Sequence, residues 1–524
     1  MLRHTAVKSI NIPGTVTVMG YDVFLGCTAL SDITHSEGDK DVVGSKGLEY
    51  YSPDGASYWV YSMGDCEDQD IVIPESHGGL PVTGIERMAF YNCENIRSVV
   101  IPDTVKEIGE YAFAGCTSLT EIPLPDALAC IGDAAFSGCS SLSAITLPDT
   151  VEQIGRAAFG ACTSLRRMIV PDGVTVVEEG TFGGCTSLAE IRLPDSITVI
   201  GYSAFWDCTS LRHIDIPANV TVLEGSAFQG CIALEYVRVP DGVTKIGDYA
   251  FAECESLNNV ELPAGLTSIG GSAFAGCRSL RSITVREGIK QIGEHAFSNC
   301  TSLVEIHLSE GISVIESFAF WGCSALKEIT LPASLTRIKK QTFYGCSALE
   351  EIALPANLTH IDEEAFSGCS ALREITLPAR LVCVGEYAFK NCESLSRLTI
   401  REGATGTVTL DSYAFYGCSG LTELVISGSV GHIGTFAFDS CTALERVTVS
   451  AGVRVIDAYA FSGCYNLVEV TLPNSLKRVD PDAFNVCYDL RDVFFAGTRQ
   501  QLADITPYYC FPAACILHCT DGDF

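Results

Sequence analysis

The chain has 524 residues, of which 47% are hydrophobic and 19% charged, and its formal net charge is −31. Nucleic acids and anionic membrane surfaces are bound by clustered Lys and Arg, so this charge disfavours both as partners. No apolar run approaches the roughly 18 residues needed to span a bilayer, so membrane insertion is not expected.

Residues 1–35 contain one isolated repeat unit, built around Phe24 and Cys27. The first residues lack the uninterrupted apolar core of a secretory signal. No wall or membrane anchor is recognisable either. We therefore expect either an intracellular protein or a fragment of a longer, exported protein whose signal and anchor are missing.

Residues 36–82 interrupt the repeat and are predicted to form a linker and a β-hairpin. Five aromatic residues surround a Pro-Asp-Gly turn at residues 53–55, which is typical of two short strands joined by a tight turn. The first coil of a solenoid exposes its apolar face and needs a cover. We expect the hairpin to be that N-terminal cap.

Residues 83–493 are predicted to be a continuous array of 18 units. A small insertion near residues 404–408 lengthens one interval by three residues, and all other intervals are 23 residues. A fixed period of this length indicates a solenoid. Each unit is marked by one phenylalanine: Phe90, Phe113, Phe136, Phe159, Phe182, Phe205, Phe228, Phe251, Phe274, Phe297, Phe320, Phe343, Phe366, Phe389, Phe415, Phe438, Phe461 and Phe484.

The unit that contains Phe113 shows the pattern within one coil. Leu119, Ile122 and Leu124 have the L-x-x-L-x-L spacing of a strand that sends alternate side chains inward. Pro125 ends this strand, because proline cannot donate a ladder hydrogen bond. Leu128 and Ile131 are expected to start a second short extended segment on the opposite side of the coil. The predicted fold class is a β-rich leucine-rich-repeat solenoid, curved and right-handed, with parallel strands on its concave face.

Cysteine is also tied to the repeat. Of the 25 cysteines, 19 stand three residues after a repeat phenylalanine. A residue type confined to one position fills one structural slot, and cysteine packs as a small hydrophobe. We therefore expect a column of mostly reduced, buried thiols.

Residues 494–524 leave the period and are predicted to be a C-terminal cap that ends in an apolar strand at 515–518. Cys510, Cys515, His518 and Cys519 lie close together in this segment. Four such ligands suit tetrahedral zinc, but a strand would send residue 518 away from 515 and 519. Packing within the cap is favoured over zinc or over a disulfide of Cys510, and no metal or other cofactor is expected.

The repeat A-F-x-G-C-x-x-L-x-x-I-x-L-P resembles the BspA-like (treponemal-type) leucine-rich repeats of bacterial and protist surface proteins. The segments GLPVTGIERMAFYNC and FFAGTRQQLADI resemble the entry and closing segments of that family. The resemblance implies a leucine-rich-repeat solenoid, a role in adhesion or in host or matrix binding, and a location at the cell surface or outside the cell.

Catalytic motifs are absent from the sequence. It has no H-E-x-x-H, P-loop, dinucleotide fingerprint or G-x-S-x-G elbow. We therefore expect a non-enzymatic, monomeric protein that recognises a protein or glycan through the concave face. The alternative is a rigid scaffold or sensor arm of a larger intracellular complex.

The residues eight and ten positions after each Phe should point outward on the concave face. The first of these positions holds glutamate in four consecutive units and a mixed set further toward the N-terminus. A column of like charges could bind a basic peptide, an amine or Ca²⁺, and Lys327 and Arg373 are expected to relieve part of its repulsion. Alternatively, glutamate is a consensus residue tolerated in water. The candidate ligand-binding residues are Glu305, Glu328, Glu351, Glu374, His213 and Tyr236.

A second candidate is an aromatic edge formed by residues directly after the repeat Phe. Trp206, Trp321 and Tyr344 occupy this slot, as does Tyr416, where other units carry mostly small residues. Flat rings there can stack on sugars or on a partner protein. Ordinary packing at the edge of the coils is the alternative.

Overall fold

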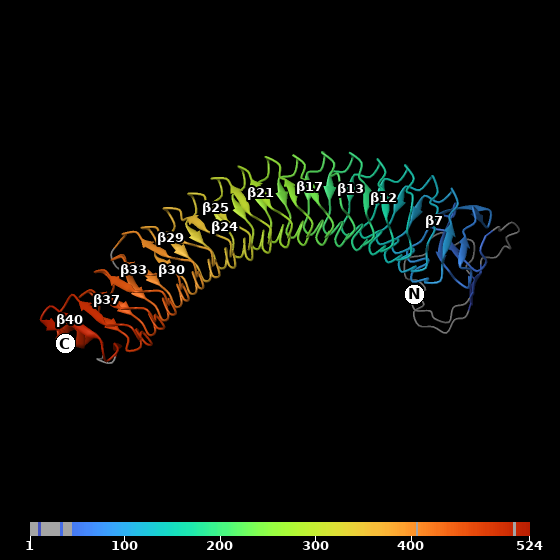
Figure 1. The fold of residues 1–524 in the computed structure, drawn as a ribbon. Coiled ribbons are helices and arrows are strands. Elements are labelled where there is room, and N and C mark those ends of the chain that lie inside the picture. The colour runs from blue at the N-terminus through green and yellow to red at the C-terminus, as the bar shows by residue number, and fades with distance from the viewer. Residues whose placement is uncertain (1–8, 12–31, 35–43, 405–406, 507–509, 524) are drawn as a thin grey trace. The chain divides into compact units, whose positions relative to one another are not determined.

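The computed structural model describes residues 9–11, 32–34, 44–404, 407–506 and 510–523. The chain divides into two compact units, Met1–Gly242 and Val243–Phe524, and each is described by itself. Phe24 and Cys27 lie outside the described residues, as do residues 405 and 406 of the insertion. Figure 1 shows short strands stacked coil upon coil in both units.

The first unit begins with two short parallel strands, β1 (Ser9–Asn11) and β2 (Asp32–Thr34). Strands β3 (Glu49–Tyr51) and β4 (Tyr58–Ser62) then form the antiparallel hairpin expected around the Pro-Asp-Gly turn. The Asp54 carboxylate accepts the backbone N–H groups of Ala56 and Ser57 inside that turn. Strand β4 pairs in parallel with β7 (Leu80–Ile85), so the hairpin continues the sheet of the following coils.

Each coil of the array contributes up to two strands, which we call the first and the second strand. In the first unit, first strands are β8 (Ser98–Val100), β12 (Arg167–Ile169), β14 (Glu190–Arg192) and β17 (Tyr236–Arg238). Second strands are β9 (Glu107–Ile108), β10 (Cys130–Ile131), β11 (Gln153–Ile154), β13 (Val176–Val177), β15 (Val199–Ile200) and β16 (Val222–Leu223). Two short strands precede them, β5 (Asp70–Val72), which pairs with β8, and β6 (Ser76–His77), which pairs with β7.

In the second unit, the first strands are β19 (Asn259–Glu261), β21 (Ser282–Val285), β23 (Glu305–Leu308), β25 (Glu328–Thr330), β27 (Glu351–Ala353), β29 (Glu374–Leu377), β31 (Arg397–Ile400), β33 (Glu423–Ile426), β35 (Arg446–Val449), β37 (Glu469–Leu472) and β39 (Asp492–Phe495). The second strands are β18 (Lys245–Ile246), β20 (Ser268–Ile269), β22 (Gln291–Ile292), β24 (Val314–Ile315), β26 (Arg337–Ile338), β28 (His360–Ile361), β30 (Cys383–Val384), β32 (Val408–Leu410), β34 (Val430–Ile433), β36 (Val455–Ile456) and β38 (Arg478–Val479).

The core of each unit is a set of columns, one for every inward position of the repeat. Leu119, Ile122, Leu128 and Ile131 are buried, as the sequence predicted for this coil, but Leu124, which was also predicted to point inward, is only partly buried. The repeat phenylalanines lie beside them and stack in nearly parallel pairs, as in Phe90 and Phe113, whose ring centroids are 5.0 Å apart. Neighbouring coils pair in parallel at a spacing of 23 residues, as β21 does with β23. The parallel β-solenoid predicted from the period is therefore confirmed.

The cysteine column has a second role that the sequence pattern did not show. Cys300 is fully buried, and its thiol donates to the carbonyl oxygen of Phe274 at 3.2 Å. The same carbonyl accepts the backbone N–H of Cys277 within its own turn. The thiol thus uses the second lone pair of a buried carbonyl, which few residues small enough for this slot can do. Free thiols are found at every cysteine within the described residues.

The C-terminal segment adds one helix and two strands to the last coil. Helix α1 (Arg499–Ile505), absent from our prediction, begins with a capping box between Thr498 and Gln501. Strand β40 (Ile516–Cys519) pairs in parallel with β39, and β41 (Gly522–Asp523) pairs with β40 in antiparallel fashion. The predicted apolar strand is thus present, displaced by one residue. It extends the first-strand sheet beyond its last repeat.

Candidate binding surfaces

The first strands present two outward columns of side chains, eight and ten positions after each repeat Phe, and the first of them contains the candidate binding residues. In β23, Ile306 is buried, whereas Glu305 and His307 on either side of it are exposed. Strands β25, β27 and β29 alternate in the same way. The residues eight and ten positions after the Phe therefore point outward, as the period-2 geometry of a strand requires.

Four consecutive coils place glutamate in the first of these columns, and we call Glu305, Glu328, Glu351 and Glu374 the glutamate ladder. Glu328 is the register partner of both Glu305 and Glu351. Glu374 takes the same position in β29, and its partner on the far side is Arg397. Among the described residues, Glu328, Glu351 and Glu374 form no ion pair, and Glu305 meets only the His307 ring at 3.5 Å.

The same column is neutralised elsewhere. In the first unit, Arg167 and Glu190 are register partners and lie 3.4 Å apart. In the second unit, Glu423 and Arg446 are register partners at 2.6 Å. Like charges also meet where Glu469 and Asp492 are register partners, so the glutamate ladder differs from the rest of the column by its longer run of like charges.

Arg373 was expected to relieve part of the repulsion between the ladder carboxylates, but it pairs with a residue outside the ladder. Arg373, one position before Glu374, pairs with Glu350 at 3.0 Å. Glu350 belongs to the position before the ladder, so this ion pair runs beside the ladder and leaves its carboxylates exposed to one another. Arg373 therefore does not relieve the repulsion expected among Glu305, Glu328 and Glu351.

The two other candidates on the strand face lie in the first unit. His213 is exposed, and its Nε2 lies 2.9 Å from the Asp215 carboxylate. Its ring stacks on that of Tyr236 in the next coil at a centroid separation of 6.4 Å. The structure therefore brings these two residues together as a small polar and aromatic patch.

The predicted aromatic edge lies on the turns that carry the repeat Phe. Trp206 is 44% exposed. Trp321 and Tyr344 stack at 6.0 Å with an interplanar angle of 14° and are partly exposed. Tyr416 instead packs edge-on against Tyr413.

A longer aromatic feature lies on the turns of the second unit and was missed from the sequence. The residue two positions before the repeat Phe has a positive φ in coil after coil, and in four consecutive coils it is aromatic. Tyr387, Tyr413, Phe436 and Tyr459 have φ values of 56°, 60°, 59° and 58°. Their rings stack at centroid separations of 4.6, 4.7 and 4.7 Å. We call these four residues the aromatic ladder.

Aromatic residues are a poor conformational choice for this slot. Left-handed backbone costs a non-glycine residue about 1–2 kcal/mol, and one coil does use glycine here, Gly180 with φ 61°. Each stacked aromatic pair contributes about 0.5–1.5 kcal/mol in return. The signal available in the sequence was the common slot of these four residues, which the three-residue insertion partly hides.

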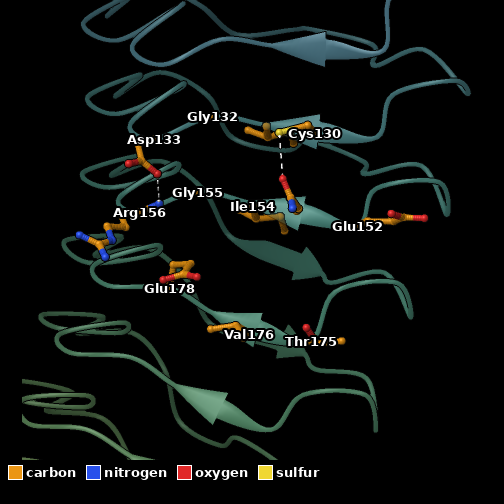
Figure 2. Close-up of a pocket in the computed structure, with 12 residues that line it drawn as sticks. Cys130, Gly132, Asp133, Glu152, Ile154, Gly155, Arg156, Thr175, Val176 and Glu178 are labelled. Atoms are coloured by element: carbon orange, nitrogen blue, oxygen red, sulfur yellow. Dashed lines mark hydrogen bonds between the residues drawn. The ribbon is translucent and has the colours of Figure 1, made fainter.

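The second strands of the first unit line a surface hollow of about 470 Å³ (Figure 2). The Cys130 thiol contacts the Gln153 side-chain oxygen at 3.6 Å, and the Asp133 carboxylate accepts the backbone N–H of Arg156. Figure 2 shows Glu152 and Glu178 on opposite sides of the hollow. Asp133 and Arg156 lie on the same side as Glu178, so the charged groups do not surround the hollow (Figure 2).

The four residues considered as zinc ligands, Cys510, Cys515, His518 and Cys519, make other contacts. His518 Nε2 lies 2.8 Å from Asp492 and its Nδ1 lies 2.9 Å from Asp523, while the ring stacks on Phe494. Cys510 is buried, and burial raises the pKa of its thiol to about 12. Across the described parts of the chain, no group of three or more His, Cys, Asp or Glu side chains is placed to hold a metal ion. No helix there is long and apolar enough to cross a bilayer.

A family comparison connects this geometry to known proteins. The family described as BspA type leucine rich repeat region (6 copies) matches residues 2–45, 83–212, 175–304, 221–350, 290–407 and 408–516. The chain belongs to the BspA-type leucine-rich-repeat family. The predicted resemblance is thereby confirmed, and the family and the fold are those of leucine-rich-repeat scaffolds, which are generally not enzymes.

Solved structures of the same kind resemble the chain along most of its length. A leucine-rich repeat protein from Bacteroides ovatus is 26% identical, with a TM-score of 0.56, and the match covers 91% of this BspA-type chain and 99% of that one. A leucine rich cell surface protein from Faecalibacterium prausnitzii is 23% identical, with a TM-score of 0.42 and coverage of 89% and 98%. A search of curated proteins gave no match.

Proposed function

We propose that this BspA-type protein is a non-catalytic recognition or adhesion protein, and that the face of its first strands binds a partner protein with a basic surface. The observation that carries the proposal is the glutamate ladder. Four exposed carboxylates follow one another over β23, β25, β27 and β29. Glu305, Glu328 and Glu351 are register partners, and none of these three has an opposite charge as a register partner.

Electrostatics gives the reason for a basic partner. Like charges directly opposite each other in a sheet destabilise it, and the same column elsewhere pairs opposite charges, as in Glu423 and Arg446. A Lys or Arg from a partner placed between two ladder carboxylates would offset their mutual repulsion by two attractions. Complementary charge of this kind raises the association rate and selects among partners.

The His213–Tyr236 patch and the edge residues Trp206, Trp321 and Tyr344 are proposed as further contacts. Partly exposed aromatic rings contribute strongly to protein interfaces, and they also stack on sugars. The patch and the ladder differ in charge and lie in different units. We therefore assign them to different parts of a partner, or to different partners.

The test is a binding screen of the biotinylated full chain on arrays of purified proteins and of glycans. The double variant Glu328→Lys/Glu351→Lys is expected to lose its strongest basic protein ligands. The matched control, Glu423→Lys/Glu469→Lys, makes the same charge change in the same column but next to Arg446, and it is expected to keep them. If the ladder variant retained every interaction, or if all of the ligands were glycans, the ladder would not be the binding site.

A further inference from the structure

The aromatic ladder is an exposed surface feature of the second unit. All four of its side chains are partly exposed although they lie on the turn beside the fully buried Phe column. Because successive rings are less than 5 Å apart, the inner faces of the stack cover one another. Solvent therefore reaches the ring edges and the tyrosine hydroxyls. Sugars stack on open ring faces, so this geometry favours a protein segment over a glycan.

A cation already occupies one end of this surface. Lys390 Nζ lies 4.9 Å from the centroid of the Tyr387 ring and 5.9 Å from that of Tyr416. An ammonium group within about 6 Å of a ring centroid is attracted by the negative face of the ring. The aromatic turns of this unit thus accept basic side chains.

Carboxylates flank both ends of the ladder. Glu386 directly precedes Tyr387, and Glu364 takes the ladder slot in the coil before it. Asp482 takes the slot after Tyr459. Together with burial, the nearby Tyr413, Glu386 and Glu364 raise the pKa of the Tyr387 hydroxyl, and Asp482 raises that of Tyr459. The surface is therefore apolar at its centre and acidic toward both ends.

We propose that the aromatic ladder, Tyr387, Tyr413, Phe436 and Tyr459, is a docking surface for an extended protein segment that has an apolar centre and a basic residue toward each end. The apolar centre covers the exposed ring edges, and the two basic residues reach the carboxylates that flank the stack. This surface is separate from the glutamate ladder and does not depend on it.

The coil spacing sets the length of the segment. Five coil steps separate Glu364 from Asp482, which amounts to roughly 24 Å at about 4.8 Å per step. An extended chain advances about 3.3 Å per residue, so the two basic residues should stand about seven positions apart.

The experiment uses the full chain and a fluorescein-labelled eight-residue peptide with Lys at positions 1 and 8 and Val, Pro and Ala between them. Binding is followed by fluorescence anisotropy. The variant Tyr413→Asn/Phe436→Asn removes the two central rings of the aromatic ladder. Asparagine is chosen because it tolerates the left-handed backbone of these positions. It is expected to bind the peptide at least tenfold more weakly, with an unchanged circular dichroism spectrum.

Matched controls separate this surface from general attraction to an acidic protein. Tyr249 occupies the same slot with φ 59° and is 48% exposed, and within the described residues it has no stacked aromatic neighbour. Tyr249→Asn and the charge-matched variant Glu423→Lys/Glu469→Lys should bind the peptide like the unaltered chain. A peptide with Glu at both ends should bind at least tenfold more weakly. The proposal would be overturned if Tyr413→Asn/Phe436→Asn bound the peptide as well as the unaltered chain, or if the unaltered chain did not bind it. It would also be overturned if cellohexaose bound in place of the peptide and this binding depended on the aromatic ladder.

Discussion

Reversing one charge in the glutamate ladder should stabilise the protein. Glu328 has a glutamate as its register partner on each side, Glu305 and Glu351. Two unit charges about 5 Å apart in water interact by roughly 0.8 kcal/mol, less when salt is present. Glu328→Lys converts two repulsions into two attractions, so we expect a gain of about 1–2 kcal/mol at low salt. At about 1–2 °C per kcal/mol for a unit or chain of this size, the unfolding midpoint should rise measurably.

The matched variant Glu423→Lys should have the opposite effect. It makes the same change of net charge in the same column and the same unit, but it replaces the attraction between Glu423 and Arg446 by repulsion. An exposed pair of this kind contributes about 0.2–1 kcal/mol, so a loss of that order is expected.

Differential scanning calorimetry at 20 mM and at 1 M NaCl checks both variants. The Debye length falls to about 3 Å at 1 M, so the two midpoints should converge at high salt. If both variants shifted the midpoint in the same direction, or if the difference between them survived 1 M NaCl, the repulsion assigned to the ladder would be refuted.

Three further outcomes are expected. Cys300→Ala should lower the free energy of unfolding, measured by thermal denaturation, by about 1–2 kcal/mol, because it leaves a small cavity and removes the thiol hydrogen bond to Phe274. Cys300→Ser keeps a donor and should lower it by less. If Cys300→Ser were the less stable variant, packing and not the hydrogen bond would explain cysteine at this position. Alkylation of the native protein at pH 8, read by mass spectrometry, should modify Cys519 well before the Cys300 thiol, since burial raises the pKa of Cys300 far above its usual range; early labelling of Cys300 would contradict its burial. His518 has a raised pKa because of its hydrogen bond to Asp492, with a further contribution from Asp523. Its stabilisation of β40 and β41 is therefore fully present below about pH 6.5 and is lost as pH rises through the raised value. Hydrogen exchange of these strands, corrected for intrinsic rates, should then be more protected at pH 6 than at pH 8, and His518→Gln should abolish the difference.

Local chemistry was sufficient to predict much of the fold. The 23-residue interval between phenylalanines predicts a solenoid, because a coil that buries its apolar face only against its neighbours must repeat its pattern. The alternation around Ile306 predicts which side chains of β23 point outward. The residues of the α1 capping box, Thr498 and Gln501, also have the spacing that marks a helix N-terminus in a sequence.

The binding surfaces depended on relations between coils, and a repeat pattern does not specify these fully. Glu328 is known to repel its neighbours only once its register partners are known. Arg373 pairs with Glu350 because of side-chain reach across coils, which spacing along the chain does not define.

The sequence by itself determined the period, the inward columns and the family of this protein, because these follow from the residue type at each repeated position. The tertiary structure decided what the columns do. The positive φ of Tyr387 and Tyr413, each two residues before a repeat Phe, aligns their rings into a stack. The return of the chain one coil later brings a cysteine thiol to the free lone pair of a Phe carbonyl. Both features arise between residues that are 23 or more positions apart in the chain and adjacent only after the coils have stacked.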